Sequence, residues 1–188
     1  MQRFFFVISL TSLISACAVV PDAQTQVYSV VDRQYLQQKD NWALEGRLAL
    51  VNEKESVSMS VIWRHTPVQD DIELSGPLAQ GQMQIHIREN EVAVDEGDKV
   101  QVYQGSPNDI VAEVLRVDIP VSALRFWVLG VNDPAFSYAL LSEGFVQNEW
   151  VVKFGPMQWV GTDQLPKKMT AQKADVRIKL IVDEWELL

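Results

Sequence analysis

The sequence contains few of the residues that most often carry enzyme chemistry. Its 188 residues include one cysteine and two histidines. A single cysteine excludes an intramolecular disulfide, so a packed core must stabilise the fold. We expect His65 and His86 to be solvated, because neither belongs to a metal-binding spacing. The sequence also has no Gly-x-Ser-x-Gly elbow and no phosphate-binding glycine loop. We therefore expect neither an enzyme nor a bound metal or cofactor.

Positive charge is also scarce. Lysine and arginine total 16 against 25 acidic residues, which gives a formal net charge of −9. An acidic chain without a basic stripe is a poor ligand for nucleic acid and for anionic lipid head groups. Hydrophobic residues make up 47% of the chain, which is typical of a globular protein and sufficient for one core. We expect a single domain that acts as a monomer.

The most apolar stretch is short, and it leads to the only cysteine. Arg3 precedes an apolar run over residues 4–14, and Leu13-Ile14-Ser15-Ala16-Cys17 closes it. A bilayer-spanning helix needs about 20 residues, so this run fits a signal peptide better. The small residue Ala16 before the thiol of Cys17 resembles a bacterial lipobox, which predicts a lipid on Cys17. An ordinary signal peptide and an uncleaved membrane anchor are the alternatives.

The lipobox divides the chain into three parts. Residues 1–16 are the predicted signal peptide, residues 17–26 a lipidated tether, and residues 27–188 the folded domain. Ala18 follows the cysteine. In lipoproteins of enteric-type bacteria an aspartate at this position resembles an inner-membrane retention signal. Ala18 therefore predicts a protein anchored by its lipid in the outer membrane, facing the periplasm.

Beyond the tether, hydrophobic residues alternate with a period of two, which predicts short antiparallel strands. Residues 27–39 and two later segments have helical spacing instead. Ser106 is the predicted N-cap of the second helix, and Gly130 is the expected stop of the third. The expected strands cover residues 42–50, 57–63, 72–74, 83–87, 92–94, 100–102, 150–154, 169–171 and 176–185. This pattern predicts one mainly β domain (α+β class) with inserted helices.

Six tryptophans and five methionines are many for a small β domain without a cofactor motif. Met59, Trp63, Met83 and Trp150 fall on expected inward positions of the strands. They either fill a solid core or surround a pliable apolar cavity in a curved sheet, and the sequence leaves both possibilities open. The loop over residues 75–81 raises a similar question, because Leu78 either packs back onto the core or protrudes as an apolar knob.

Several segments together resemble the LolB family, over essentially the whole chain after the signal peptide. They are the lipobox, Asn41-Trp42-Ala43-Leu44-Glu45-Gly46-Arg47, the Gly76-Pro77-Leu78 loop, residues 119–130 (IPVSALRFWVLG) and residues 177–185. The segment IPVSALRFWVLG is the most specific of these. The resemblance implies a single incomplete antiparallel β-barrel with covering helices and an apolar cavity. The side chains expected to line this cavity are Trp42, Leu44, Met59, Val61, Trp63, Met83, Ile85, Leu124 and Trp150.

The resemblance also implies a function. Members of this family accept lipoproteins from the periplasmic carrier LolA, hold their acyl chains and insert them into the outer membrane. Leu78 matches a protruding leucine needed for membrane insertion, although Ala79 stands where the family pattern has glycine. Two other classes stay open: an assembly lipoprotein that binds proteins with a solid β domain, and a hydrolase of envelope components.

Overall fold

A long antiparallel sheet forms the body of the protein. The computed structural model describes residues 28–77 and 81–187, and in these ranges eleven strands join one sheet in the order β6-β5-β4-β3-β2-β1-β13-β12-β9-β8-β7. The strands are β1 (Trp42–Val51), β2 (Ser56–Thr66), β3 (Gln69–Ser75), β4 (Met83–Arg88), β5 (Glu91–Asp95), β6 (Val100–Gln104), β7 (Ala139–Leu141), β8 (Gly144–Gln147), β9 (Trp150–Phe154), β12 (Lys168–Lys173) and β13 (Val176–Leu187). A separate hairpin pairs β10 (Met157–Val160) with β11 (Asp163–Pro166).

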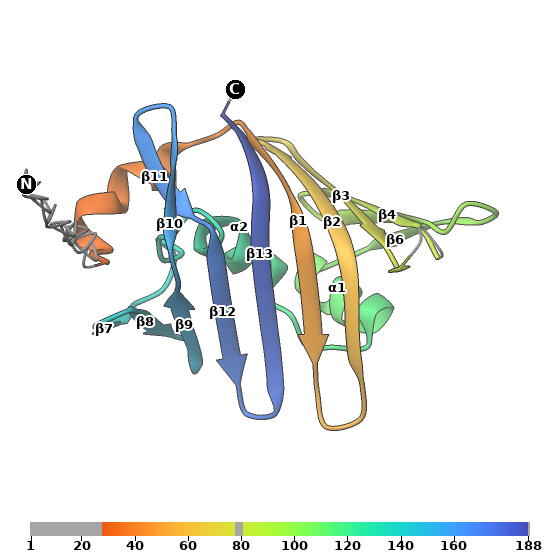
Figure 1. Cartoon of the computed structure of the whole chain (residues 1–188). Coiled ribbons are helices and arrows are strands. Elements are labelled where there is room, and N and C mark those ends of the chain that lie inside the picture. Colours follow the sequence, from red (N-terminus) through yellow and green to blue (C-terminus); the bar gives the residue numbers. More distant parts are fainter. Residues whose placement is uncertain (1–27, 78–80, 188) are drawn as a thin grey trace, which may run out of the picture.

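The sheet is curved and open. Its middle is the pair of long strands β1 and β13, which brings the end of the domain beside its beginning. The edge strands β6 and β7 end the sheet on opposite sides instead of closing it into a ring, as Figure 1 shows. The predicted incomplete antiparallel barrel is thereby confirmed.

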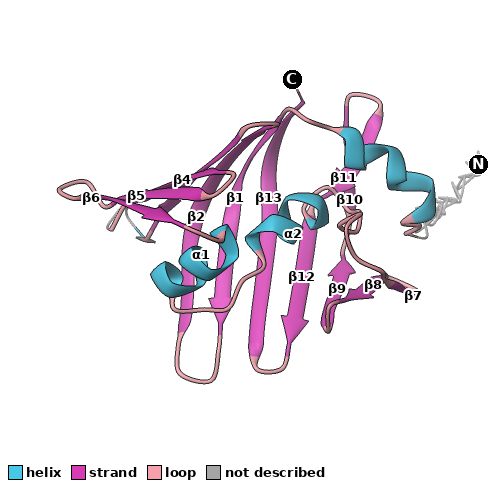
Figure 2. Ribbon diagram, turned by 180° about the vertical axis from the view of Figure 1, so that it is seen from behind, coloured by secondary structure: helices cyan, strands magenta, loops and turns pink. Residues whose placement is uncertain are grey.

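Two helices cover one face of the sheet (Figure 2). They are α1 (Pro107–Leu115) and α2 (Val121–Trp127). Pro107 occupies the first turn of α1, where its missing N–H costs nothing. Gly130 follows α2 with φ +84°, a conformation that L side chains rarely adopt, so it ends the helical segment as predicted. Ser106 is at the N-cap position of α1, but within the described chain its side chain makes no capping hydrogen bond.

Several elements differ from the sequence-based expectations. Residues 27–39 were expected as one helix, whereas the structure has a 3-10 helix η1 at Val31–Gln38. Strands β7, β8, β10 and β11 were not among the predicted strands. They have three or four residues each, too few for an alternating pattern to be distinctive. No helix in residues 28–77 and 81–187 is both long and apolar enough to cross a membrane.

Candidate functional site

An apolar cavity lies between the concave face of the sheet and the two covering helices. Its walls come from strands β1 to β4, β12 and β13, from α1 and α2, and from the residues that join and follow these helices. Every side chain that lines it is apolar. The centre of a water-sized sphere can occupy about 50 Å³ of it. The lining is compatible in polarity with hydrocarbon and contains no nucleophile, acid or base.

The alternation of each strand aims one set of side chains into this cavity. On β1, Leu44, Leu48 and Leu50 point to the same side and line the cavity. The register places Leu44 opposite Trp63 of β2, and Leu50 opposite Ile178 of β13. The antiparallel pairing therefore continues the apolar surface from one strand to the next.

The structure brings together five of the nine residues expected to line the cavity. These five are Leu44, Val61, Trp63, Ile85 and Leu124. The other cavity walls come from residues such as Leu48, Leu74, Met169 and Leu180. Their alternation was visible in the sequence, but the strand pairing that brings them to one cavity was not.

The remaining four of the nine lie elsewhere. Trp42 is buried at one end of the sheet, with ring centroids 5.3 Å from Trp63 and 5.8 Å from Trp185. Trp150 packs against Trp127 at 5.9 Å between centroids. Met59 and Met83 are partly buried and pack against the core. These four side chains therefore belong to the core around the cavity and do not border the cavity itself.

The end of α2 is held by a buried amide. The side chain of Gln147 on β8 accepts hydrogen bonds from Trp127 Nε1 (2.9 Å) and from the backbone N–H of Asp133 (3.0 Å). Its Nε2 donates to the carbonyl oxygens of Asp133 (2.8 Å) and Phe136 (2.9 Å). The four bonds connect the last residue of α2 and the segment after it to the sheet, so Gln147 holds the C-terminal end of this helix at the sheet.

The N-terminal 3-10 helix is attached to the β10–β11 hairpin by a buried carboxylate. Asp163 lies 2.9 Å from Nζ of Lys39 and accepts a 3.0 Å hydrogen bond from the hydroxyl of Tyr35. Burial raises the pKa of Asp163, but the hydrogen bonds from Lys39 and Tyr35 outweigh this effect, and the pKa lies below its ordinary value.

Tyr28 connects the start of the described chain to the segment after α2. Its hydroxyl donates a hydrogen bond to the carbonyl oxygen of Gly130 (2.8 Å), and burial raises its pKa.

His65 is buried, whereas we expected it to be solvated. His65 is 9% exposed and packs against the ring of Trp42. Its Nδ1 lies 2.7 Å from Asp70 Oδ1, which also accepts a 2.8 Å hydrogen bond from Trp63 Nε1. His86 is partly exposed beside Asp71. Within residues 28–77 and 81–187, no group of three or more His, Cys, Asp or Glu side chains could hold a metal ion.

Two predicted functional residues cannot be placed. Cys17 and Leu78 both lie outside the described residues. The described ends of the loop around Leu78 are the exposed Pro77 and Gly81.

Comparison with known proteins decides the family. The family model described as outer membrane lipoprotein LolB matches residues 40–185. The chain belongs to the LolB family. It is 29% identical to the outer-membrane lipoprotein LolB of Thiobacillus denitrificans, with 99% of this chain and 98% of that protein covered. It is 25% identical to those of Ectopseudomonas mendocina (99% and 97%) and Vibrio campbellii (98% and 98%).

Family membership and the full-length relatives place this LolB-family protein in the outer membrane, as a lipoprotein of the lipoprotein localisation pathway. Solved structures share its fold. A LolA superfamily protein from Nitrosomonas europaea has a TM-score of 0.52 at 7% identity and covers 80% of this chain and 87% of its own. A DUF1329 family protein from Desulfovibrio piger has the same TM-score at 8% identity, with 84% and 90% covered. At these identities the likeness shows the open, helix-covered sheet and nothing more.

Proposed function

We propose that this protein accepts lipoproteins from the periplasmic carrier LolA by taking their acyl chains into the apolar cavity, and then inserts them into the outer membrane. The observation that carries the proposal is the cavity, whose lining is entirely apolar. Ligand pockets normally combine apolar walls with a few convergent polar groups. A wholly apolar lining instead suits a ligand that is itself hydrocarbon.

Burial of the acyl chains supplies the driving force for each step. Each methylene removed from water contributes about 0.8 kcal/mol, so a lipoprotein with free acyl chains cannot cross the periplasm unaided. Transfer needs no nucleotide if the receptor binds the chains more tightly than the carrier and the bilayer binds them more tightly still. The predicted lipid on Cys17 would keep the receptor at the outer membrane, the bilayer into which the chains are finally inserted.

The cavity must enlarge to hold an acyl chain. Pockets that enclose small organic ligands measure about 300–1,000 Å³, whereas this cavity offers about 50 Å³. The covering helices are the movable wall, since the sheet is continuous behind them. The side chain of Asn108 on α1 accepts a 3.0 Å hydrogen bond from the backbone N–H of Ser122 on α2. We therefore propose that α1 and the start of α2 swing away from the sheet together when acyl chains enter, while Gln147 holds the C-terminal end of α2.

Transfer from the carrier tests the proposal. Val61 is 3% exposed and lines the cavity on β2, while Val57 lies on the same face of that strand but is 43% exposed. We expect Val61→Phe to leave a labelled lipoprotein on LolA and Val57→Phe to accept it like the parent. Thermal melting of both variants checks that they are folded. If a folded Val61→Phe protein accepts the lipoprotein as well as the parent does, the cavity is excluded as the acyl-binding site. That result would favour a protein that binds only the polypeptide part of the lipoprotein.

A further inference from the structure

A second hollow opens beside the acyl cavity and has a different character. It lies between the β2–β3 turn and the start of α2, and we call it the vestibule; its volume is about 480 Å³. Polar and charged side chains line it, among them Gln69, Asp70, Glu89 and Arg125. Val68 at its outer rim is 78% exposed, so the vestibule opens to solvent.

The vestibule adjoins the acyl cavity. Val121, the first residue of α2, lines both hollows. Trp63 spans the boundary, because its ring lines the cavity while its Nε1 donates to Asp70 in the vestibule. On α2, Leu124 faces the cavity and the next residue, Arg125, lines the vestibule. Once the cavity has enlarged, a ligand with an apolar and a polar part would therefore place the two parts in neighbouring hollows.

Arg125 has an unused hydrogen-bond donor in the vestibule. Its Nε is buried, and it is the one buried side-chain polar atom among the described residues that has no hydrogen-bond partner. The guanidinium carbon lies 4.8 Å from the ring centroid of Phe126, which shields one face of the group. A buried donor without an acceptor is unfavourable, because no hydrogen bond replaces the one that it made to water. The site would regain this free energy when a ligand supplies an acceptor.

The other charges of the vestibule restrict the class of ligand. Asp70 and Glu89 are carboxylates in the same hollow as Arg125. They disfavour an anion such as a phosphate by like-charge repulsion. A neutral group with carbonyl acceptors and N–H donors fits better, since Arg125 can donate to a carbonyl oxygen and Glu89 can accept from an N–H.

We infer that the vestibule binds the polar junction of the client lipoprotein, its glyceryl esters and acylated cysteine together with the first peptide bonds. This inference rests on the proposed function, because the acyl chains must occupy the adjoining cavity. Ester and amide carbonyl oxygens accept from Arg125, and the polypeptide leaves past Val68. Arg125 then discriminates a lipoprotein from a bare hydrocarbon.

Photocrosslinking in the full lipidated chain, reconstituted in liposomes, tests the inference. A benzophenone amino acid placed at Leu115, which lines the cavity, reports acyl chains; one placed at Val68 reports the peptide. The ligand is a synthetic tripalmitoylated hexapeptide. We expect mass spectrometry to find acyl adducts at position 115 and peptide adducts at position 68. Acyl adducts at position 115 without peptide adducts at position 68 would contradict only the inference about the vestibule. Absence of acyl adducts at position 115 would contradict the proposed function as well.

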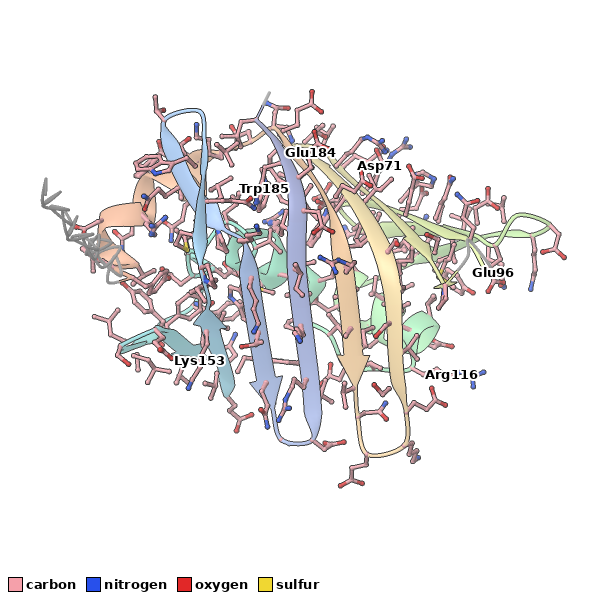
Figure 3. All side chains as sticks on the ribbon, viewed as in Figure 1. Asp71, Glu96, Arg116, Lys153, Glu184 and Trp185 are labelled. Atoms are coloured by element: carbon pink, nitrogen blue, oxygen red, sulfur yellow. The ribbon has the colours of Figure 1, made fainter. Side chains whose placement is uncertain are left out.

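Substitution of Arg125 tests whether this side chain binds the polar junction of the lipopeptide. Arg125→Met should raise the half-saturating concentration of the lipopeptide, read at position 115, about tenfold, as expected for a lost charge-assisted hydrogen bond. The same variant should bind labelled hexadecane within about twofold of the parent, since Arg125 lines the vestibule and not the acyl cavity. Arg116→Met is the matched control, because Arg116 is exposed just after α1 (Figure 3) and lines neither the cavity nor the vestibule. Equal loss for both ligands, or no loss for the lipopeptide, would contradict the assignment.

Discussion

At the scale of single residues, we expect substitution of Leu78 to separate acceptance of a client from its delivery. The LolB resemblance gives this leucine a protruding position, and the described residues at both ends of its loop are exposed. We expect Leu78→Glu to change the free energy of unfolding by no more than about 0.5 kcal/mol, as for surface substitutions. It should accept acyl chains from the carrier but fail to release them into liposomes, because a charge opposes entry into hydrocarbon. Leu78→Met is the control, and normal delivery by Leu78→Glu would remove the loop from the mechanism.

Asp163 makes the attachment of the N-terminal 3-10 helix sensitive to acid. Its folded-state pKa is lowered by Lys39 and Tyr35 against the effect of burial. A carboxyl with a depressed folded-state pKa contributes stability above its unfolded pKa and loses it as pH falls through the folded value. Asp163→Asn should therefore cost about 1.5–3 kcal/mol at pH 7, the range for a hydrogen bond to a charged group.

The cost of Asp163→Asn should shrink as denaturation is measured at lower pH, toward pH 3. Asp40→Asn is a matched control, since Asp40 is exposed next to the same helix. A pH-independent cost for Asp163→Asn would show that the carboxylate charge does not hold the helix.

At the scale of elements, Gly46 allows the backbones of the central strands β1 and β13 to approach closely. The register of β1 and β13 shifts between Glu45 and Gly46, which leaves Asp183 as the extra residue of a bulge. A Cβ on Gly46 would collide with the backbone carbonyl oxygen of Ile181. Arg47 secures the bulge with two hydrogen bonds to Asp183, at 3.0 and 2.8 Å.

We expect Gly46→Ala to lower the free energy of unfolding by about 1–3 kcal/mol, as overpacking does. Chemical denaturation measures this cost. Ser60→Ala, at an exposed position of the neighbouring strand β2, is the control and should change stability little. A Gly46→Ala protein as stable as the parent would mean that the two strands can separate at the bulge without penalty.

Elements differ in how far the sequence predicts them. Strands such as β1 and β2 were predictable because they are ten and eleven residues long, and apolar side chains alternate along them over several residues. The short strand β7 carries no such pattern, since all three of its residues are exposed. The burial of His65 was not predictable either, because it depends on Trp42 and Asp70, which reach it only through strand pairing.

At the scale of the whole molecule, the cavity depends on contacts that periodicity does not encode. Alternation tells which face of a strand is apolar, but it does not tell which strands are neighbours. Pairing of β1 with β13 brings Leu48 beside Leu180, and only this pairing makes their apolar faces one wall. The prediction of an incomplete barrel came from the resemblance to the LolB family. Trp42 and Trp150 were predicted to line the cavity because they are large and lie on inward-facing positions, but they do not border it.

A fluorescence titration tests whether the cavity binds acyl chains. A chain beginning at Ala18 is titrated with a fatty-acid probe whose emission depends on the polarity around it. We expect saturable binding, with the emission that the probe shows in an apolar environment. Val61→Phe should abolish this binding and Val57→Phe should retain it. Probe emission that stays that of water, or binding that Val61→Phe leaves unchanged, would contradict acyl binding in the cavity.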